Sequence, residues 1–82
     1  MNRILVTGGA GFIGSNFVRL VLAEQQDCFI VNVDKLTYAG NLENLEGFLD
    51  NKNHIFVKAD ICDGKTIEQL IDKYQIETII NF

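Results

Sequence analysis

The chain has 82 residues, of which 48% are hydrophobic and 22% are charged, and its formal net charge is -4. This length allows one domain or part of one, and the composition is typical of a globular chain rather than a disordered one. The acidic balance argues against nucleic acid as a partner, and the lack of an apolar run of roughly 18 residues argues against a membrane, which leaves a cytoplasmic protein as the prediction.

Strands and helices alternate in the first half of the chain. Residues 3–7 form a short apolar run that ends at glycines and predicts a strand buried on both faces. From Phe12 to about residue 26, the apolar positions 13, 17, 20 and 21 recur at helical spacing and predict an amphipathic helix. Residues 28–33 form a second apolar strand, which Asp34 ends.

The second half continues the alternation. After a polar loop, Asn41 is placed to cap a short helix that would use Leu42, Leu45 and Leu49. Residues 54–59 predict a third strand, and Asp63 is placed to cap a helix with apolar positions 67, 70, 71 and 74. Residues 77–82 predict a fourth strand. This order favours an α/β fold, a Rossmann-type doubly wound parallel sheet with strands in the order 3-2-1-4.

The fourth strand would form an edge of that sheet. Its apolar residues Ile79 and Ile80 have no charged neighbour that would keep another strand from pairing there. Because natural domains rarely leave such an edge bare, we expect this chain to be the N-terminal part of a larger sheet.

Glycines cluster where the first strand turns into the first helix. Gly8, Gly11 and Gly14 match the longer-spaced form of the dinucleotide fingerprint, and Gly9 with the last two matches the shorter form. One glycine permits the tight turn, one lets a pyrophosphate touch the backbone, and Gly14 lets the helix pack close to the strand. The N–H groups and dipole of the helix start favour phosphates. A P-loop is excluded because Ser15 occupies the position of its lysine.

Acidic residues follow the second and third strands. Asp34 lies 20 residues after Gly14, where the fingerprint requires a carboxylate that accepts hydrogen bonds from the ribose hydroxyls. This carboxylate would repel a 2′-phosphate, which favours NAD over NADP, although the adjacent Lys35 softens that preference. Asp60 would accept a bond from the adenine amino group and the Ile61 N–H would donate to a ring nitrogen. Two structural alternatives stay open, namely a glycine turn without a ligand and an Asp60 that only ends a strand.

The cysteines and the histidine give no metal-site signature. Cys28 and Cys62 are far apart and neither belongs to a C-x-x-C pair, so we expect two buried thiols. His54 begins the third strand, at the end away from the ligand crevice, and we expect it on the surface.

Two longer motifs resemble a known family. TGGAGFIGS at 7–15 is typical of extended short-chain dehydrogenases/reductases that act on nucleotide sugars. VNVDKLTYAGNLENL at 31–45, followed by KADICD at 58–63, resembles the dTDP-glucose 4,6-dehydratase family among them. The resemblance covers essentially the whole chain. It implies a homodimeric cytoplasmic lyase of deoxysugar biosynthesis whose substrate is a nucleotide sugar. NAD would take a hydride from C4 of the hexose, water would leave across C5 and C6, and the hydride would return to C6.

The resemblance also implies a cofactor site. Carried over position by position, Phe12 and Ile13 contact the pyrophosphate region. The adenosine ribose is surrounded by Asp34, Lys35, Leu36 and Thr37, and the adenine is held by Asp60 and Ile61. With the glycines, the expected NAD-binding residues are Gly8, Gly11, Phe12, Ile13, Gly14, Asp34, Lys35, Leu36, Thr37, Asp60 and Ile61.

No catalytic residue is expected in residues 1–82. The base of this family is the tyrosine of Tyr-x-x-x-Lys, but Leu42 follows Tyr38 and Thr78 follows Tyr74 at that spacing. We therefore expect residues 1–82 to be the N-terminal part of an NAD-binding Rossmann domain, with the rest of that domain and the sugar-nucleotide domain absent from this chain. The alternatives are another NAD-dependent nucleotide-sugar epimerase or decarboxylase, and a non-catalytic nucleotide-binding module.

Overall fold

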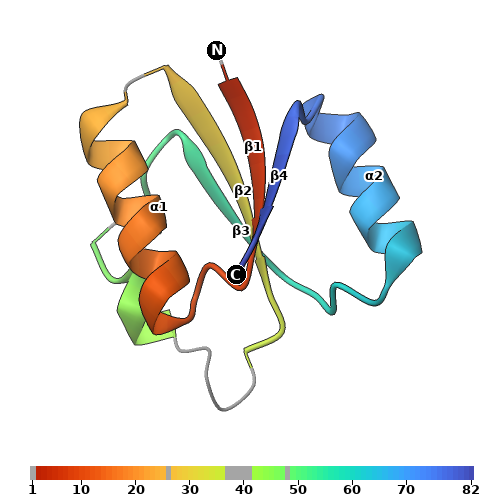
Figure 1. Ribbon diagram of the computed structural model, residues 1–82, viewed down its shortest axis with the longest axis horizontal. Coiled ribbons are helices and arrows are strands. Elements are labelled where there is room, and N and C mark those ends of the chain that lie inside the picture. The colour runs from red at the N-terminus through yellow and green to blue at the C-terminus, as the bar shows by residue number, and fades with distance from the viewer. Residues whose placement is uncertain (1, 26, 37–41, 48) are drawn as a thin grey trace.

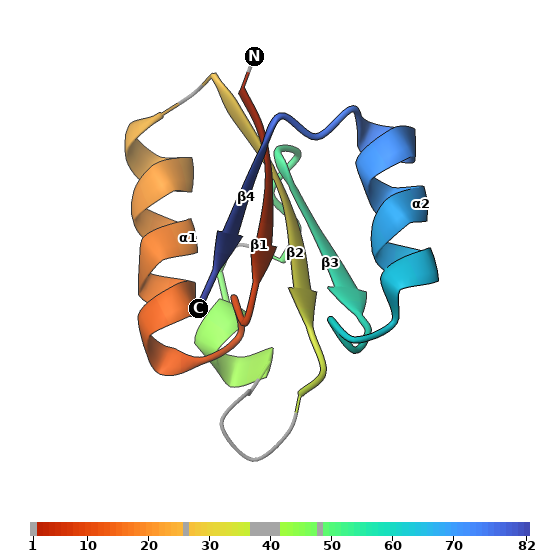
Figure 2. The ribbon, with the colours of Figure 1, turned by 45° about the vertical axis from the view of Figure 1, so that its right-hand side comes forward.

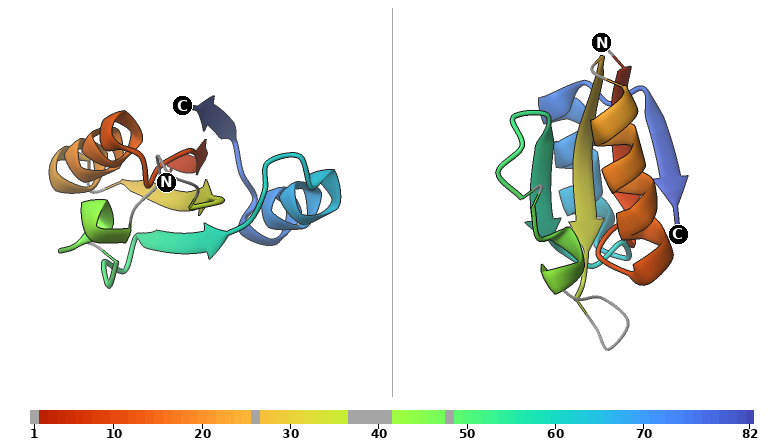
Figure 3. Two further views of the ribbon diagram at one scale, coloured as in Figure 1. Left: turned by 90° about the horizontal axis from the view of Figure 1, so that it is seen from below. Right: turned by 90° about the vertical axis from the view of Figure 1, so that its left-hand side faces the viewer.

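The computed structural model of the protein describes residues 2–25, 27–36, 42–47 and 49–82. Within these ranges, one parallel sheet has the strand order β3-β2-β1-β4, and α1 with η1 covers one of its faces while α2 covers the other (Figures 1, 2 and 3). This confirms the predicted doubly wound fold and strand order. The elements are β1 (Asn2–Thr7), α1 (Phe12–Glu24), β2 (Cys28–Asp34), the 3-10 helix η1 (Leu42–Leu45), β3 (His54–Lys58), α2 (Gly64–Tyr74) and β4 (Thr78–Asn81).

The two faces of the sheet bury separate clusters, because successive side chains of a strand point to opposite faces. On the α1 side, the core consists of fully buried side chains, namely Val6, Ala10, Val18, Ile30 and Leu45. On the α2 side, Leu5, Val31 and Val33 are buried, and they contact partly buried residues of α2. Both middle strands are therefore apolar on both faces, as the continuous hydrophobic runs predict.

The buried face of α1 agrees only in part with the predicted one, because Phe17 and Val21 pack partly buried against the α1-side cluster but two other positions do not. Ile13 is 71% exposed and Leu20 is 58% exposed, so both lie outside the face that meets the sheet. The residues of this helix that are buried are Gly14, Ser15 and Val18. The buried face of α1 therefore begins at Gly14, and a prediction based on the spacing of large apolar residues does not include a glycine.

The structure of α2 agrees with the prediction. The carboxylate of Asp63 caps the helix, since its Oδ1 accepts from the Thr66 N–H at 3.3 Å and its Oδ2 accepts from the Thr66 hydroxyl at 2.7 Å. The predicted apolar positions pack against the α2-side cluster, namely Ile67, Leu70, Ile71 and Tyr74. Among the described residues, neither α1 nor α2 combines the length and apolarity that crossing a membrane requires.

The predicted short helix before the third strand is a single 3-10 turn. It ends at Leu45, which is fully buried, whereas Leu49 lies beyond the turn and is 41% exposed. The predicted cap, Asn41, lies outside the described residues.

β4 lies at one end of the strand order, as predicted, and pairs with β1. Ile79 is 53% exposed on this strand. The ring of Phe82, which follows β4, contacts the ring of Phe17 in α1 at a centroid distance of 5.3 Å. The edge that the sequence predicted is thus present and partly apolar.

Two side-chain environments were predicted wrongly. His54 begins β3 as expected, but it is buried, because it aligns with Ile30 of β2 and so faces the α1-side cluster. Cys28 is buried, whereas Cys62 is exposed in the turn before α2. In both cases the sequence showed the position of the residue in the chain but not whether its side chain is buried.

Candidate functional site

The carboxyl ends of the parallel strands meet at one edge of the sheet, where the arrowheads point in Figure 1. Three segments leave the strands at this edge. They are the glycine loop after β1 (residues 8–11), residues 35–36 after β2, and residues 59–61 after β3. In open parallel sheets this edge is where ligands bind. The structure therefore brings the described residues of the predicted site to one edge.

The glycine loop turns tightly from β1 into α1. Gly8 has φ 75°, its N–H donates to the Val33 carbonyl at 2.9 Å, and its carbonyl accepts from the Gly11 N–H at 3.2 Å. A left-handed φ of this kind suits glycine. A Cβ added to Gly14 would overlap the carbonyl oxygen of Gly8, so the missing side chain lets α1 lie directly against the loop.

The N-terminus of α1 is open toward this edge. Gly11 is the N-cap residue and supplies no side-chain hydrogen bond, and the first turn contains no acidic residue. The side chains of Phe12 and Ile13, in that first turn, are 76% and 71% exposed. The first N–H groups of a helix have no partner within the helix and carry a partial positive charge, so this end suits an anionic group such as a phosphate.

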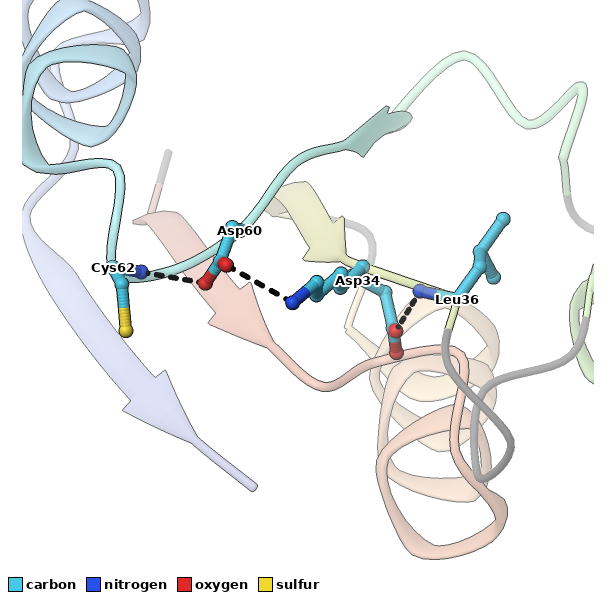
Figure 4. Close-up of polar contacts among 5 residues, drawn as sticks. Asp34, Leu36, Asp60 and Cys62 are labelled. Carbon is cyan, nitrogen blue, oxygen red and sulfur yellow. Dashed lines mark hydrogen bonds and ion pairs between the residues drawn. The ribbon is translucent and has the colours of Figure 1, made fainter.

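Asp34 links the end of β2 to the glycine loop. It is 9% exposed, and its Oδ2 accepts from the Ala10 N–H at 2.8 Å. Its Oδ1 accepts from the Leu36 N–H at 2.8 Å (Figure 4). Each carboxylate oxygen has capacity for a second hydrogen bond, so Asp34 holds the loop and can still accept from a hydroxyl of a ligand. Leu36, which has a left-handed φ of 60°, packs partly buried on the α1-side cluster.

Lys35 and Asp60 form an ion pair between the ends of β2 and β3. The Lys35 Nζ lies 3.2 Å from Asp60 Oδ2, and Asp60 Oδ1 accepts from the Cys62 N–H at 2.9 Å (Figure 4). The Cys62 N–H and then the Lys35 ammonium lower the pKa of Asp60 below its ordinary value. Ile61, which lies between Asp60 and Cys62 in the sequence, is 47% exposed. The sequence placed Lys35 beside Asp34, and the structure pairs it with a carboxylate of the next strand.

The remaining candidates lie elsewhere or outside the described ranges. Thr37, predicted beside the ribose, and Tyr38 lie outside the described residues. The ring of Tyr74 packs against the ring of Phe29 at 5.8 Å on the α2 side of the sheet. A cavity of about 460 Å³ lined by Leu22 and residues 51–53 lies near the start of β3, at the opposite edge. Neither Tyr74 nor this cavity joins the site described above.

Two asparagines that the sequence reading missed also contact the glycine loop. Asn44 of η1 donates from its Nδ2 to the Ala10 carbonyl at 2.9 Å. Asn32 of β2 is fully buried and lies beneath Gly9, where an added Cβ would overlap its carboxamide. Asn32 carried a signal, since it interrupts an otherwise apolar strand. Asn44 carried none, because its contact joins residues 34 positions apart.

Comparisons with known proteins place the chain among nucleotide-sugar enzymes. A family model described as GDP-mannose 4,6 dehydratase matches residues 5–82. The dTDP-glucose 4,6-dehydratase of Haemophilus influenzae is 46% identical over 81 residues, which are 99% of this chain and 24% of that protein. The chain thus spans about a quarter of the length of this relative.

Solved structures share the fold. The dTDP-glucose 4,6-dehydratase of Bacillus anthracis, in complex with NAD, matches with a TM-score of 0.98 and 46% identity over 100% of this chain and 26% of that one. The UDP-glucose 4-epimerase of Thermotoga maritima, with UDP-glucose, matches with a TM-score of 0.80 and 34% identity over 98% of this chain and 23% of that one. Of these two, the dehydratase is the more similar in both sequence and structure.

Proposed function

The chain belongs to the GDP-mannose 4,6 dehydratase family, and from this membership we propose that residues 1–82 are the NAD-binding portion of a nucleotide-sugar dehydratase. One observation carries the proposal. Asp34 ends β2 with one carboxylate oxygen on the Ala10 N–H of the glycine loop, beside a helix N-terminus that no side chain caps. A dinucleotide needs this combination of N–H donors for its pyrophosphate and a carboxylate for its ribose.

The cofactor is assigned to the site in three parts. The pyrophosphate lies at the start of α1, at the glycine loop with Gly8, Gly11, Phe12, Ile13 and Gly14. The adenosine ribose lies against Asp34, with Lys35, Leu36 and Thr37 around it, and the adenine lies at Asp60 and Ile61. When bound, NAD supplies the hydride acceptor, and the residues of this chain bind and orient it. The NAD complex of the Bacillus anthracis relative supports this choice of cofactor.

The charges favour NAD over NADP. A 2′-phosphate on the adenosine ribose would lie against the carboxylate of Asp34, which repels it. Lys35 is the nearby cation that would tolerate such a phosphate, but its ammonium lies 3.2 Å from Asp60 Oδ2. To pair with the 2′-phosphate of NADP, Lys35 would therefore have to leave the carboxylate of Asp60.

For the whole enzyme we propose the conversion of dTDP-glucose to dTDP-4-keto-6-deoxyglucose and water, in a cytoplasmic homodimer of deoxysugar biosynthesis. The names of the relatives support this substrate. We propose further that residues 1–82 are the N-terminal part of a larger NAD-binding domain that also needs catalytic residues and a sugar-nucleotide domain from elsewhere. The greater length of the relatives and the exposed Ile79 on the outer strand support this division.

The first test is the affinity of the Asp34→Ala protein for NAD and for NADP, measured by calorimetric titration. Loss of a hydrogen bond to a charged group should weaken NAD by about 10- to 100-fold. NADP should lose less, because the substitution also removes a repulsion. Asp72→Ala, an exposed aspartate of α2, is the control and should leave both affinities unchanged. Equal losses for the two cofactors would contradict the ribose assignment.

A nucleotide-sugar 4-epimerase is the second candidate function, supported by the match to the Thermotoga maritima enzyme. Incubating the full-length protein with dTDP-glucose and NAD separates the two, because only a dehydratase releases water and yields the 4-keto-6-deoxy sugar. A hexose epimer as the product would favour the epimerase.

A further inference from the structure

Asn32 is a polar side chain in the middle of an apolar strand. It is fully buried in β2, two residues before Asp34, so both side chains project from the same face of the sheet. Its Nδ2 lies 3.3 Å from Nε2 of His54, which begins the neighbouring strand. Among the described residues, Asn32 Oδ1 is buried and has no hydrogen-bond partner. Buried polar atoms usually have one, so this oxygen calls for an explanation.

The glycine loop packs directly on this carboxamide. A Cβ built on Gly9 would overlap the Asn32 carboxamide, with Cγ and Nδ2 also within 2.7 Å of it. In glycine a hydrogen takes the place of that Cβ, so Gly9 packs directly against the Asn32 carboxamide. The carboxamide thus supports the loop from beneath.

Two residues of one strand face therefore fix two successive residues of the loop. Asp34 accepts from the Ala10 N–H, and Asn32 lies against Gly9. We propose that Asn32 is a positioning residue for cofactor binding, which acts through Gly9 and is itself held by His54. Its carboxamide sets how closely the phosphate-binding loop lies on the sheet. This inference rests on the proposed function, because it assigns the loop to the cofactor.

The proposal explains Gly9 by its contact with Asn32. A Cβ at Gly9 is excluded by Asn32 below the loop, not by a ligand above it. Substitutions at positions 9 and 32 should therefore compensate for each other. Truncating the Asn32 side chain makes room for a side chain at position 9. A glycine required by the cofactor would not be rescued in this way.

The test compares four forms of the full-length protein, namely the wild type, Gly9→Ala, Asn32→Ala and the double variant, by their dissociation constants for NAD. We expect a loss of about 50-fold for Gly9→Ala and about tenfold for Asn32→Ala. The double variant should bind within about threefold of Asn32→Ala, because the alanine methyl occupies the vacated space. Should the Gly9→Ala protein not fold, recovery of a folded, NAD-binding double variant gives the same answer.

Three results would overturn the proposal. The first is a Gly9→Ala loss that persists in full in the double variant, which would mean that the cofactor requires Gly9. The second is an Asn32→Ala protein that unfolds more easily but binds NAD as the wild type does, which would make Asn32 structural only. The third is a wild-type protein that does not bind NAD, which would refute both this proposal and the proposed function. Asn2→Ala, an exposed asparagine at the start of β1, is the control and should not change the affinity.

Discussion

The helices α1 and α2 start at the same edge of the sheet but begin in opposite ways. α1 follows β1 through Gly11, with no side-chain cap and no acidic residue in its first turn. α2 follows β3 through Asp63, whose carboxylate bonds to the N–H and the hydroxyl of Thr66. An anion that approaches α1 meets free N–H groups, whereas at α2 it meets the Asp63 carboxylate, which already accepts from the Thr66 N–H.

The N-terminus of α1 is thus open to a ligand, whereas the N-terminus of α2 is closed by a side chain of the protein itself. A side-chain cap contributes about 1 kcal/mol to stability, and α1 lacks that contribution. α1 instead gains close packing, with Gly14 and Val18 buried against the sheet, while α2 buries no residue completely. The uncapped end is therefore the one that a ligand can complete.

The largest contrast is expected for one substitution made at the start of each helix. Gly14→Ala would drive a methyl group into the Gly8 carbonyl, so we expect a loss of about 3 kcal/mol in unfolding free energy and a severe loss of NAD affinity. Gly64→Ala has open space around its added Cβ and should stabilise the protein by about 0.5 kcal/mol. Urea unfolding and NAD titration of both variants measure these effects. Similar results at both positions would remove the distinction between the helices.

A smaller effect should follow from opening the capped helix. Asp63→Ala removes the hydrogen bonds to Thr66 and should lower the unfolding free energy by about 1 kcal/mol while leaving the NAD affinity unchanged. Asp63→Asn keeps a good capping side chain and should recover most of that stability. A marked change in NAD affinity in either variant would show that α2 also takes part in the site.

The smallest effect concerns the ion pair between the ends of β2 and β3. Hydrogen bonding from Cys62 and the charge of Lys35 lower the pKa of Asp60, so its ionised form favours the folded state above the ordinary aspartate pKa. That contribution is lost as the pH falls through the lowered pKa, and it is small because both partners are exposed. NMR titration of the Asp60 carboxyl carbon should give a higher midpoint in Lys35→Met than in the wild type. An identical midpoint would mean that Lys35 does not act on Asp60.

Features encoded locally could be predicted from the sequence. The alternation of apolar runs located the strands and helices along the chain, and the glycine spacing located the turn before α1. Asp63, three residues before Thr66, identified the cap of α2. In each case the deciding interactions join residues close together in the chain.

Features that depend on distant partners could not be predicted. The buried stripe of α1 starts at Gly14 and not at Ile13, because backbone proximity to Gly8 decides which side meets the sheet. The burial of His54 and its contact with Asn32 depend on the register between β2 and β3. The register depends on how the two strands pair, so the sequence of either strand alone does not determine it.

β1 lies inside the sheet, between β2 and β4, although it is the first strand of the chain to be synthesised. Its bond from the Thr7 hydroxyl to Asn81 spans 74 positions. At ribosomal rates of 5–20 residues per second, roughly 4–15 s separate the appearance of these two partners. During that interval the β1–α1–β2 unit can form with the glycine loop in place, while the other side of β1 remains open to any passing strand. The glycine loop thus lies between the first two strands of this chain to emerge, and β4 pairs with the open side of β1 only later.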